Sequence, residues 1–278
     1  MTPEELTRKV ERMLRSARLA YGHGTANARD EAAWLVDNVL RTRSGTAVER
    51  SALSLAARRI STRQPLAYLL HEAWLGEHRF YVDRRTIVPR SFIGELIGDG
   101  LNPWLAKPPK SALDMCTGSG CLGIVLAHRY PKCRVDLADL SPDALAVARK
   151  NVALHRMKTR LRVLHSDLYA GLGEANYDLI VSNPPYVKAS AMKALPAEYR
   201  KEPRLALAGG ADGLDLVHRI LAGAAERLRK GGVLICEIGH NRKALERAYP
   251  RVPFTWLETS AGDGYVFALE KTRLPQGR

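Results

Sequence analysis

The chain has 278 residues, of which 43 are basic and 29 acidic, for a formal net charge of +14. With 46% hydrophobic and 26% charged residues it has the composition of a folded globular protein, which excludes a disordered chain. The uncharged stretch from 115 to 127 is shorter than the roughly 18 residues that span a bilayer, and the N-terminus carries glutamates in place of an apolar run. We therefore expect a cytoplasmic protein with no signal peptide and no membrane contact.

The positive charge fits a polyanionic partner such as nucleic acid or a ribonucleoprotein, and it fits an arginine-rich surface equally well. No basic tail or tract decides between the two. The four cysteines form no CxxC pair, and the eight histidines are scattered along the chain. We expect reduced thiols and no metal site.

Residues 1–70 are predicted to form a helical domain. Thr2-Pro3-Glu4-Glu5 has the form of a capping box with proline at the first helical position. Asn27 can cap a second helix, a third is expected from 48 to 60, and a short one follows Gln64-Pro65. Nothing here suggests catalysis, so we assign the domain to substrate recognition; its arginines fit either RNA contacts or solvated helix faces.

A change to aromatic and β-branched residues at 71–88 predicts a β-hairpin connector. From 89 to 278, strand and helix signals alternate. Strands are expected at 112–116, 134–138, 161–164, 177–182 and 233–238, helices at 142–155, 214–229 and before residue 130, and a final hairpin at 254–258 and 265–269. This order predicts an α/β catalytic domain, a Rossmann-like sheet of seven strands with an antiparallel terminal hairpin.

A glycine-rich loop follows the first of these strands. Gly118-Ser119-Gly120-Cys121-Leu122-Gly123 fits G-x-G-x-x-G, and Asp139 stands about 20 residues further on, a pattern that serves NAD as well as S-adenosylmethionine. Asp114, inside the strand, favours S-adenosylmethionine, because a carboxylate can hold its cationic amino-acid end and a dinucleotide has no such charge. Asp167, after the third strand, can accept a hydrogen bond from the adenine amino group or cap a helix.

The tetrad Asn183-Pro184-Pro185-Tyr186 follows the buried strand at 177–182. The Asn183 side-chain oxygen and the Pro184 carbonyl can accept both hydrogens of one planar NH2 group, on which Tyr186 can stack. Such a nitrogen is a poor nucleophile because its lone pair is delocalised. Two acceptors aimed at its hydrogens free the lone pair and stabilise the charge that develops. The tetrad therefore predicts methyl transfer to a planar amide or amine.

On these residues the sequence resembles the class I S-adenosylmethionine-dependent methyltransferases that modify NH2 groups on planar carbon. Two groups share the tetrad, the N6-adenine methyltransferases and the protein N(5)-glutamine methyltransferases. The helical N-terminal part, the hairpin connector, Ile87-Val88-Pro89-Arg90 and the run from Glu202-Pro203 to Gly213-Leu214 are similar to the glutamine group.

Within that group the resemblance is to the branch that methylates a glutamine of large-subunit ribosomal protein L-three. It is carried by Pro89-Arg90-Ser91-Phe92-Ile93-Gly94-Glu95-Leu96, by Leu195-Pro196-Ala197-Glu198-Tyr199-Arg200 and by the segment 252–258. In the branch that acts on peptide release factors, the segment that corresponds to residues 89–94 has a pattern similar to Pro-Arg-Pro-Glu-Thr-Glu. Phe92 departs from the proline usual in the L-three branch. The resemblance extends from about residue 60 onward, and the N-terminal helices match only in type.

The resemblance implies S-adenosylmethionine as the methyl donor, S-adenosylhomocysteine as the product, and no metal. The methionine part would be held by Asp114, Thr117, Gly118, Ser119 and Gly120, the ribose by Asp139 and the adenine end by Asp167, with Arg90 and Glu95 bordering the methionyl group. Asn183, Pro184, Pro185 and Tyr186 would hold the glutamine side chain, and Asn183 would also contact the cofactor. No residue stands out as a general base, and none is required, because the methylated amide nitrogen is acidic enough to lose its proton afterwards.

The expected reaction is methylation of the side-chain amide nitrogen (N5) of a glutamine in L-three, either free or on an assembling particle with ribosomal RNA. The same chemistry on adenine in DNA or RNA, or on release factors, stays open, as do a non-catalytic assembly factor and an NAD-dependent oxidoreductase. Against a nucleic-acid substrate, the chain has no recognisable target-recognition domain and the base would have to be flipped out. The intact tetrad disfavours a protein without catalysis.

Overall fold

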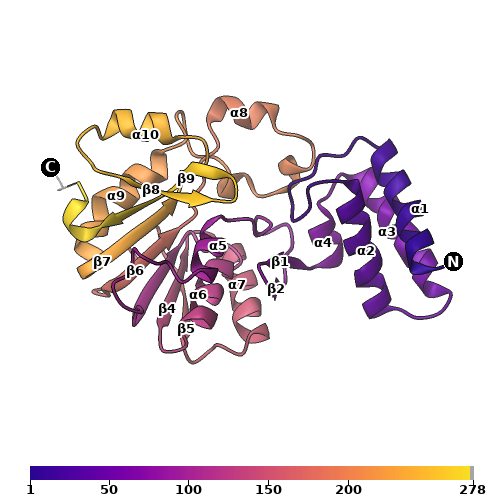
Figure 1. Cartoon of the computed structure of the whole chain (residues 1–278), viewed down its shortest axis with the longest axis horizontal. Coiled ribbons are helices and arrows are strands. Elements are labelled where there is room, and N and C mark those ends of the chain that lie inside the picture. The colour runs from indigo at the N-terminus through magenta and orange to yellow at the C-terminus, as the bar shows by residue number, and fades with distance from the viewer. Residues whose placement is uncertain (276–278) are drawn as a thin grey trace.

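A computed structural model describes residues 1–275. The N-terminal helices are α1 (Pro3–Ser16), α2 (Ala28–Thr42), α3 (Ala47–Thr62) and α4 (Leu66–Leu70), and they form one end of the molecule (Figure 1). The Thr2 capping box and the Asn27 cap are both formed as predicted, because each side-chain oxygen accepts the orphan N–H three residues on. Leucine, valine and alanine side chains of these helices pack into their own apolar core.

The connector is shorter than predicted. Only β1 (Ala73–Leu75) and β2 (His78–Phe80) pair as a hairpin, and residues 81–92 run on without strand structure. Asp83 explains the break, since its carboxylate accepts the Arg85 N–H and its carbonyl accepts the Thr86 N–H, which turns the chain away from the partner strand. The β-branched residues at 86–88 therefore lie in an extended segment and not in the hairpin.

The sheet has seven strands in the order β5-β4-β3-β6-β7-β9-β8, which confirms the predicted α/β fold class. Its members are β3 (Ser111–Met115), β4 (Arg134–Asp139), β5 (Leu161–His165), β6 (Tyr177–Ser182), β7 (Leu228–Glu237), β8 (Thr255–Thr259) and β9 (Gly262–Glu270). The first five in this order are parallel, and β9 runs antiparallel to both β7 and β8. The chain winds outward from β3 in both directions, so a crevice opens at the carboxyl ends of β3 and β6.

Helices cover both faces of this sheet (Figure 1). One apolar cluster joins the sheet to α5 (Ile93–Gly98), α6 (Cys121–Arg129) and α7 (Pro142–Leu154), and the other joins it to α9 (Asp215–Arg227) and α10 (Arg242–Ala248). Successive strand residues alternate between the clusters, as the pleat requires. Neighbours such as Ala112 and Leu113 therefore point to opposite faces.

Two boundaries differ from the prediction. α9 ends at Arg227 and β7 begins at Leu228, because Lys230-Gly231-Gly232 continues the strand instead of forming the expected turn. The chain between β6 and α9 holds α8 (Ala189–Ala194) and the short 3-10 helices η1 (Tyr199–Lys201) and η2 (Arg204–Ala206); a third, η3 (Lys271–Arg273), follows β9. Among the described residues, no helix is long and apolar enough to cross a membrane.

Candidate active site

A cavity of about 470 Å³ lies at the carboxyl edge of the sheet. It is bounded by the ends of β3 to β6, by the connector and by the segment before α9. Its walls include Gly118, Asp139, Leu140, Ser141, Ser166, Asp167, Asn183, Pro185, Arg85, Thr86, Ile87, Pro203, Leu205, Ala206, Asp215 and Arg219. Residues predicted from the glycine loop, the second and third strands and the tetrad thus share one cavity.

Asp114 lies beneath the glycine loop, almost completely buried. Its Oδ2 accepts hydrogen bonds from Thr117 Oγ1 at 2.5 Å and from the Gly123 N–H at 2.8 Å. Its Oδ1 has no partner among the described residues. Burial raises the pKa of Asp114 to about 7, despite the hydrogen bonds from Thr117 and Gly123 that lower it. A buried carboxylate oxygen without a donor is a site for a cation or an ordered water.

The loop itself needs its glycines. Gly118 and Gly120 adopt φ of +56° and +82°, a region that side chains disfavour, and open space lies beside Gly118. The Gly118 N–H donates to Asp139 Oδ2 at 2.8 Å, and Asp139 Oδ1 accepts from the Ser141 N–H at 2.9 Å. Asp139 therefore connects the glycine loop to the start of α7 while lining the cavity. The other predicted residues of this region, Asp114, Thr117, Ser119 and Gly120, are buried and do not line the cavity.

Asp167 lines the cavity and is paired with Arg219, whose Nη2 donates to Oδ2 at 2.9 Å. The helix-cap interpretation of Asp167 is wrong, because the residues after it form turns and no helix begins there. Arg219 comes from α9, so this ion pair joins the segment after β5 to the cavity wall formed by α9.

The tetrad follows β6 directly. Asn183 and Pro185 line the cavity, whereas Tyr186 is held behind it by polar contacts at both ends. Its hydroxyl donates to Glu237 Oε1 at 3.0 Å, and its carbonyl accepts from Asn241 Nδ2 at 2.9 Å. The Asn183 side chain has no hydrogen-bond partner assigned within residues 1–275, which leaves its oxygen available to a ligand.

Arg90 and Glu95 do not reach the cavity. The guanidinium of Arg90 binds both oxygens of Glu202, at 2.6 and 2.7 Å, and Glu95 Oε1 accepts from the Ser260 N–H at 2.7 Å. Burial opposes ionisation of Glu202, but Arg90 and His23 outweigh it and hold the pKa of Glu202 at about 2. Arg90 and Glu202 thus hold the segment before α5, and Glu95 ties α5 to the turn between β8 and β9.

Several residues of the site were not predicted. Leu140 and Leu205 are exposed apolar side chains on the cavity wall, 47% and 57% accessible, and Arg85 and Arg219 supply charge there. Leu140 could have been found, since it follows Asp139 at the carboxyl edge. Glu237 gave one signal, a lone carboxylate at the end of an apolar strand.

All four cysteines are free, and in the described part of the chain no group of three metal-ligating side chains could hold an ion. The polar groups of the cavity are the carboxylates of Asp139, Asp167 and Asp215, the amide of Asn183, hydroxyls, and the guanidinium groups of Arg85 and Arg219. This set suits an organic ligand that carries both a cation and hydroxyl groups.

Comparison with known proteins decides the family. The chain is 50% identical to the ribosomal protein uL3 glutamine methyltransferase of Neisseria meningitidis serogroup B, an alignment covering 98% of this chain and 94% of the relative. The Burkholderia pseudomallei protein of the same name is 46% identical over 99% and 96%. The chain belongs to the ribosomal protein uL3 glutamine methyltransferase family. It is a methyltransferase. Because the similarity spans nearly the whole chain, the expectation that it begins near residue 60 is wrong.

Two further comparisons agree on the fold. The model of the methyltransferase small domain matches residues 101–198. A methyltransferase from Pyrococcus furiosus superposes with a TM-score of 0.50 at 17% identity, covering 69% of this chain and 88% of that one. The hMettl16 catalytic domain, in complex with MAT2A 3'UTR hairpin 6, gives 0.51 at 15% identity over 78% and 79%. At such identities the likeness shows the fold alone.

Proposed function

We propose that this chain transfers a methyl group from S-adenosylmethionine to the side-chain amide nitrogen of a glutamine in ribosomal protein uL3. The observation that carries this proposal is the placement of Asn183 and Pro185 in one cavity with Gly118 and Asp139. The relatives of the chain are named ribosomal protein uL3 glutamine methyltransferases. Since a ribosomal protein is the named substrate, we place the reaction in the cytoplasm, where ribosomes assemble.

The residues that line the cavity and those of the glycine loop beneath it fit this cofactor. The unpartnered Oδ1 of Asp114 suits the cationic amino group, directly or through water, and the open space beside Gly118 suits a close backbone approach. Thr117, Ser119 and Gly120 shape the same loop. Asp139 would accept the ribose hydroxyls and Asp167 the adenine amino group. S-adenosylmethionine supplies an electrophilic methyl on its sulfonium. Arg90 and Glu95 would act only by bracing the segment around them.

The tetrad orients the amide. Asn183 Oδ1 and the Pro184 carbonyl would accept the two hydrogens of the glutamine NH2, and Pro185 gives that stretch of chain a fixed φ. The hydrogen bonds to these acceptors are stronger in the transition state, where positive charge develops on nitrogen, than in the ground state, so they lower the barrier. The amide nitrogen would gain a bond to the methyl carbon as the bond from that carbon to sulfur breaks, its electrons staying on sulfur as the thioether of S-adenosylhomocysteine, and the nitrogen would then lose one proton to water. No side chain has to act as a base.

A second cavity supports RNA as part of the substrate. It measures about 450 Å³, adjoins the first at Arg85, and is lined by Arg58, His71, Asp83 and Arg84 among others. Asp83, the only carboxylate there, is bound by Arg85 at 2.7 Å. Within residues 1–275 neither Arg58 nor Arg84 has an ion-pair partner. The unpaired arginines of this cavity would repel a basic ribosomal protein and attract phosphates. We therefore propose that the enzyme binds uL3 on an assembling particle that contains RNA.

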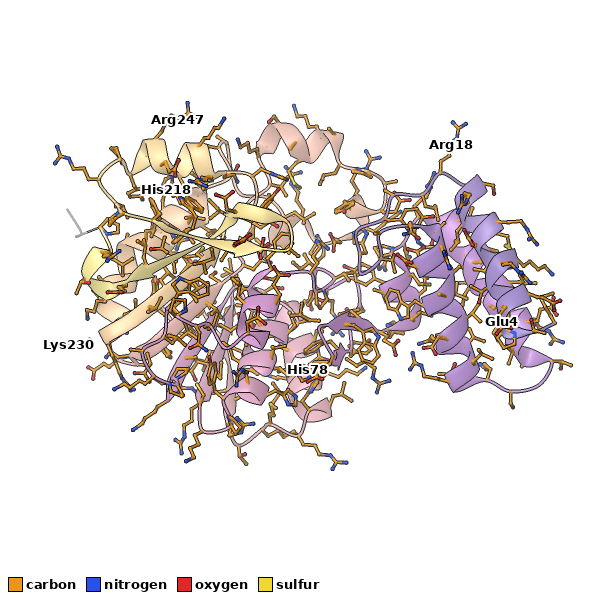
Figure 2. The ribbon with its side chains drawn as sticks, viewed as in Figure 1. Glu4, Arg18, His78, His218, Lys230 and Arg247 are labelled. Atoms are coloured by element: carbon orange, nitrogen blue, oxygen red, sulfur yellow. The ribbon has the colours of Figure 1, made fainter. Side chains whose placement is uncertain are left out.

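Salt and charge variants test the RNA contact. Activity on particles should fall steeply with salt, and the double variant R58A/R84A should reduce the slope of log affinity for RNA against log salt by about 2. The matched control is K230A/R247A, two exposed cations at the other end of the molecule (Figure 2). Equal losses in the two variants, or a flat salt response, would reject a specific contact.

The reaction itself is tested on assembling ribosomal particles that carry unmethylated uL3, with methyl-labelled S-adenosylmethionine and the variant N183A. We expect one labelled glutamine with the natural enzyme. N183A should lower kcat by about 10²-fold or more, the scale on which the loss of one preorganised hydrogen-bond donor in an oxyanion hole lowers kcat, while cofactor affinity falls much less. Retained activity in N183A would contradict the assigned role.

A further inference from the structure

Glu237 is a buried carboxylate that the proposed mechanism does not use. It lies at the carboxyl end of β7, 1% exposed, beside the tetrad. Three donors converge on it: Ser91 Oγ at 2.7 Å and the Phe92 N–H at 3.0 Å on Oε2, and the Tyr186 hydroxyl at 3.0 Å on Oε1. Burial raises the pKa of Glu237, while the hydrogen bonds from Ser91, Tyr186 and Phe92 and the nearby Arg90 oppose that rise and favour the ionised form, which only accepts.

This arrangement fixes the ring of Tyr186. Its hydroxyl is held by Glu237 and its carbonyl by Asn241. Two glycines pack closely against Tyr186. A Cβ at Gly239 would lie 2.7 Å from the Tyr186 ring, and a Cβ at Gly209 would lie 2.6 Å from the Tyr186 Cα. Tyr186 is joined to Asn183 through two prolines, whose fixed φ transmits a displacement along the chain instead of absorbing it.

The other side of Glu237 holds the segment 88–92. Ser91 and Phe92 anchor one end of this segment on Glu237, and the Val88 N–H and Arg90 anchor the other end on Glu202. Position 91 also distinguishes this chain from the release-factor branch, because the Pro-Arg-Pro pattern of that branch has proline at this position. Proline has no hydroxyl, so it cannot make the Ser91 contact to Glu237.

We propose that Glu237 and Ser91 are positioning residues for methyl transfer: Glu237 holds Tyr186, and Ser91 holds Glu237 in the orientation that sets the two acceptor oxygens of the tetrad. This role, which rests on the proposed function, lies outside the cofactor-binding residues and the tetrad. Its signature is a change in kcat with little change in cofactor affinity, since neither side chain lines the cavity.

The test compares S91A, S91T and E237Q on assembling particles that carry unmethylated uL3. S91A should lower kcat about three- to tenfold and E237Q by more than tenfold, both with cofactor Kd within about twofold of the natural enzyme, and S91T, which keeps the hydroxyl, should restore kcat. The matched control S111A removes a hydroxyl that bonds to Asn176 and Asp178 at the opposite end of β3. It should leave kcat unchanged.

A readout without substrate separates this inference from the proposed function. Hydrogen exchange in the peptide 183–187 should quicken in S91A and E237Q and stay unchanged in S91T and S111A, whatever the enzyme methylates. Unchanged exchange and kcat in S91A and E237Q would overturn the inference. So would a fall in cofactor affinity by the same factor as kcat, accompanied by a fall in Tm, since that result would indicate a general loss of structure. Failure of the natural enzyme to label uL3, with the exchange pattern as expected, would reject the proposed function alone.

Discussion

At the scale of single residues, the carboxyl of Asp114 has the most consequential environment. It is buried, it supports the glycine loop through Thr117 and Gly123, and one of its oxygens has no partner in the described residues. Its pKa of about 7 is set by burial. Binding of a cation requires the ionised form, so cofactor binding and ionisation of Asp114 should be linked.

We expect the affinity for S-adenosylmethionine to rise roughly five- to tenfold between pH 6 and 7.5, because the ionised fraction of a group with a pKa near 7 grows by that factor. The amino group of the cofactor stays largely protonated over this range, its pKa being about 8. Calorimetric titration at several pH values measures the effect. In D114N binding should be weaker and nearly independent of pH. A slope that persists in D114N would assign the effect to another group.

At the scale of elements, the loop between η2 and α9 supports the tetrad from outside. Gly209 donates its N–H to the Val187 carbonyl, and a Cβ on it would lie 2.6 Å from Tyr186 Cα and 2.8 Å from the Pro185 carbonyl. These neighbours are backbone atoms, which cannot rotate away as a flexible side chain would.

The substitution G209A should therefore displace the tetrad. We expect kcat to fall by more than tenfold, with a loss of stability of about 1–3 kcal/mol from overpacking. The control is G98A, at the end of α5, where an added Cβ meets nothing within 4 Å. Kinetics and urea unfolding of both variants decide. Equal kcat values would show that the tetrad does not depend on this loop.

How far the sequence predicts each element depends on length and pattern. The parallel strands and long helices were predicted because apolar runs and caps are local signals. The short helices α5, α8 and α10 were not, since six or seven residues are too few to show helical periodicity. The β7 boundary was missed because Gly231-Gly232 has the composition of a turn while the sheet pairing holds it in a strand.

The site follows the same rule. Its glycine loop and tetrad are contiguous motifs, so they could be predicted. The partners of Glu237 stand 146 and 51 residues away, and those of Glu202 more than 100, so only the folded chain brings them together.

At the scale of the whole molecule, the segment after the tetrad joins the helical end to the sheet (Figure 1). Glu198 pairs with Arg63 at 2.9 Å and approaches the fully buried Arg59 at 3.6 Å, and the Tyr199 hydroxyl donates to the Tyr21 carbonyl. The segment 195–200, which carries the branch resemblance, thus contacts the N-terminal helices. The boundaries 1–70, 71–88 and 89–278 remain predictions.

The substitution E198Q should weaken this junction. We expect the free energy of unfolding to fall by about 1.5–3 kcal/mol, the range for hydrogen bonds to charged groups, because the hydrogen bond from Arg63 loses its charged acceptor and buried Arg59, 3.6 Å away, loses a neighbouring charge. The control E49Q breaks the exposed pair with Lys9 and should change stability by less than about 0.5 kcal/mol. Urea unfolding measures both. Similar effects in the two variants would show that the buried junction adds no stability.

The most direct test of the proposed reaction uses ribosomal particles from cells that lack the enzyme. Purified protein and S-adenosylmethionine labelled on the methyl group are added, the product is digested with nuclease and protease, and the labelled fragment is identified by mass. We predict label on a glutamine of uL3, incorporated about 10²-fold more slowly with N183A. Label recovered as N6-methyladenine after nuclease would contradict the proposal and assign the same site to a nucleic-acid substrate.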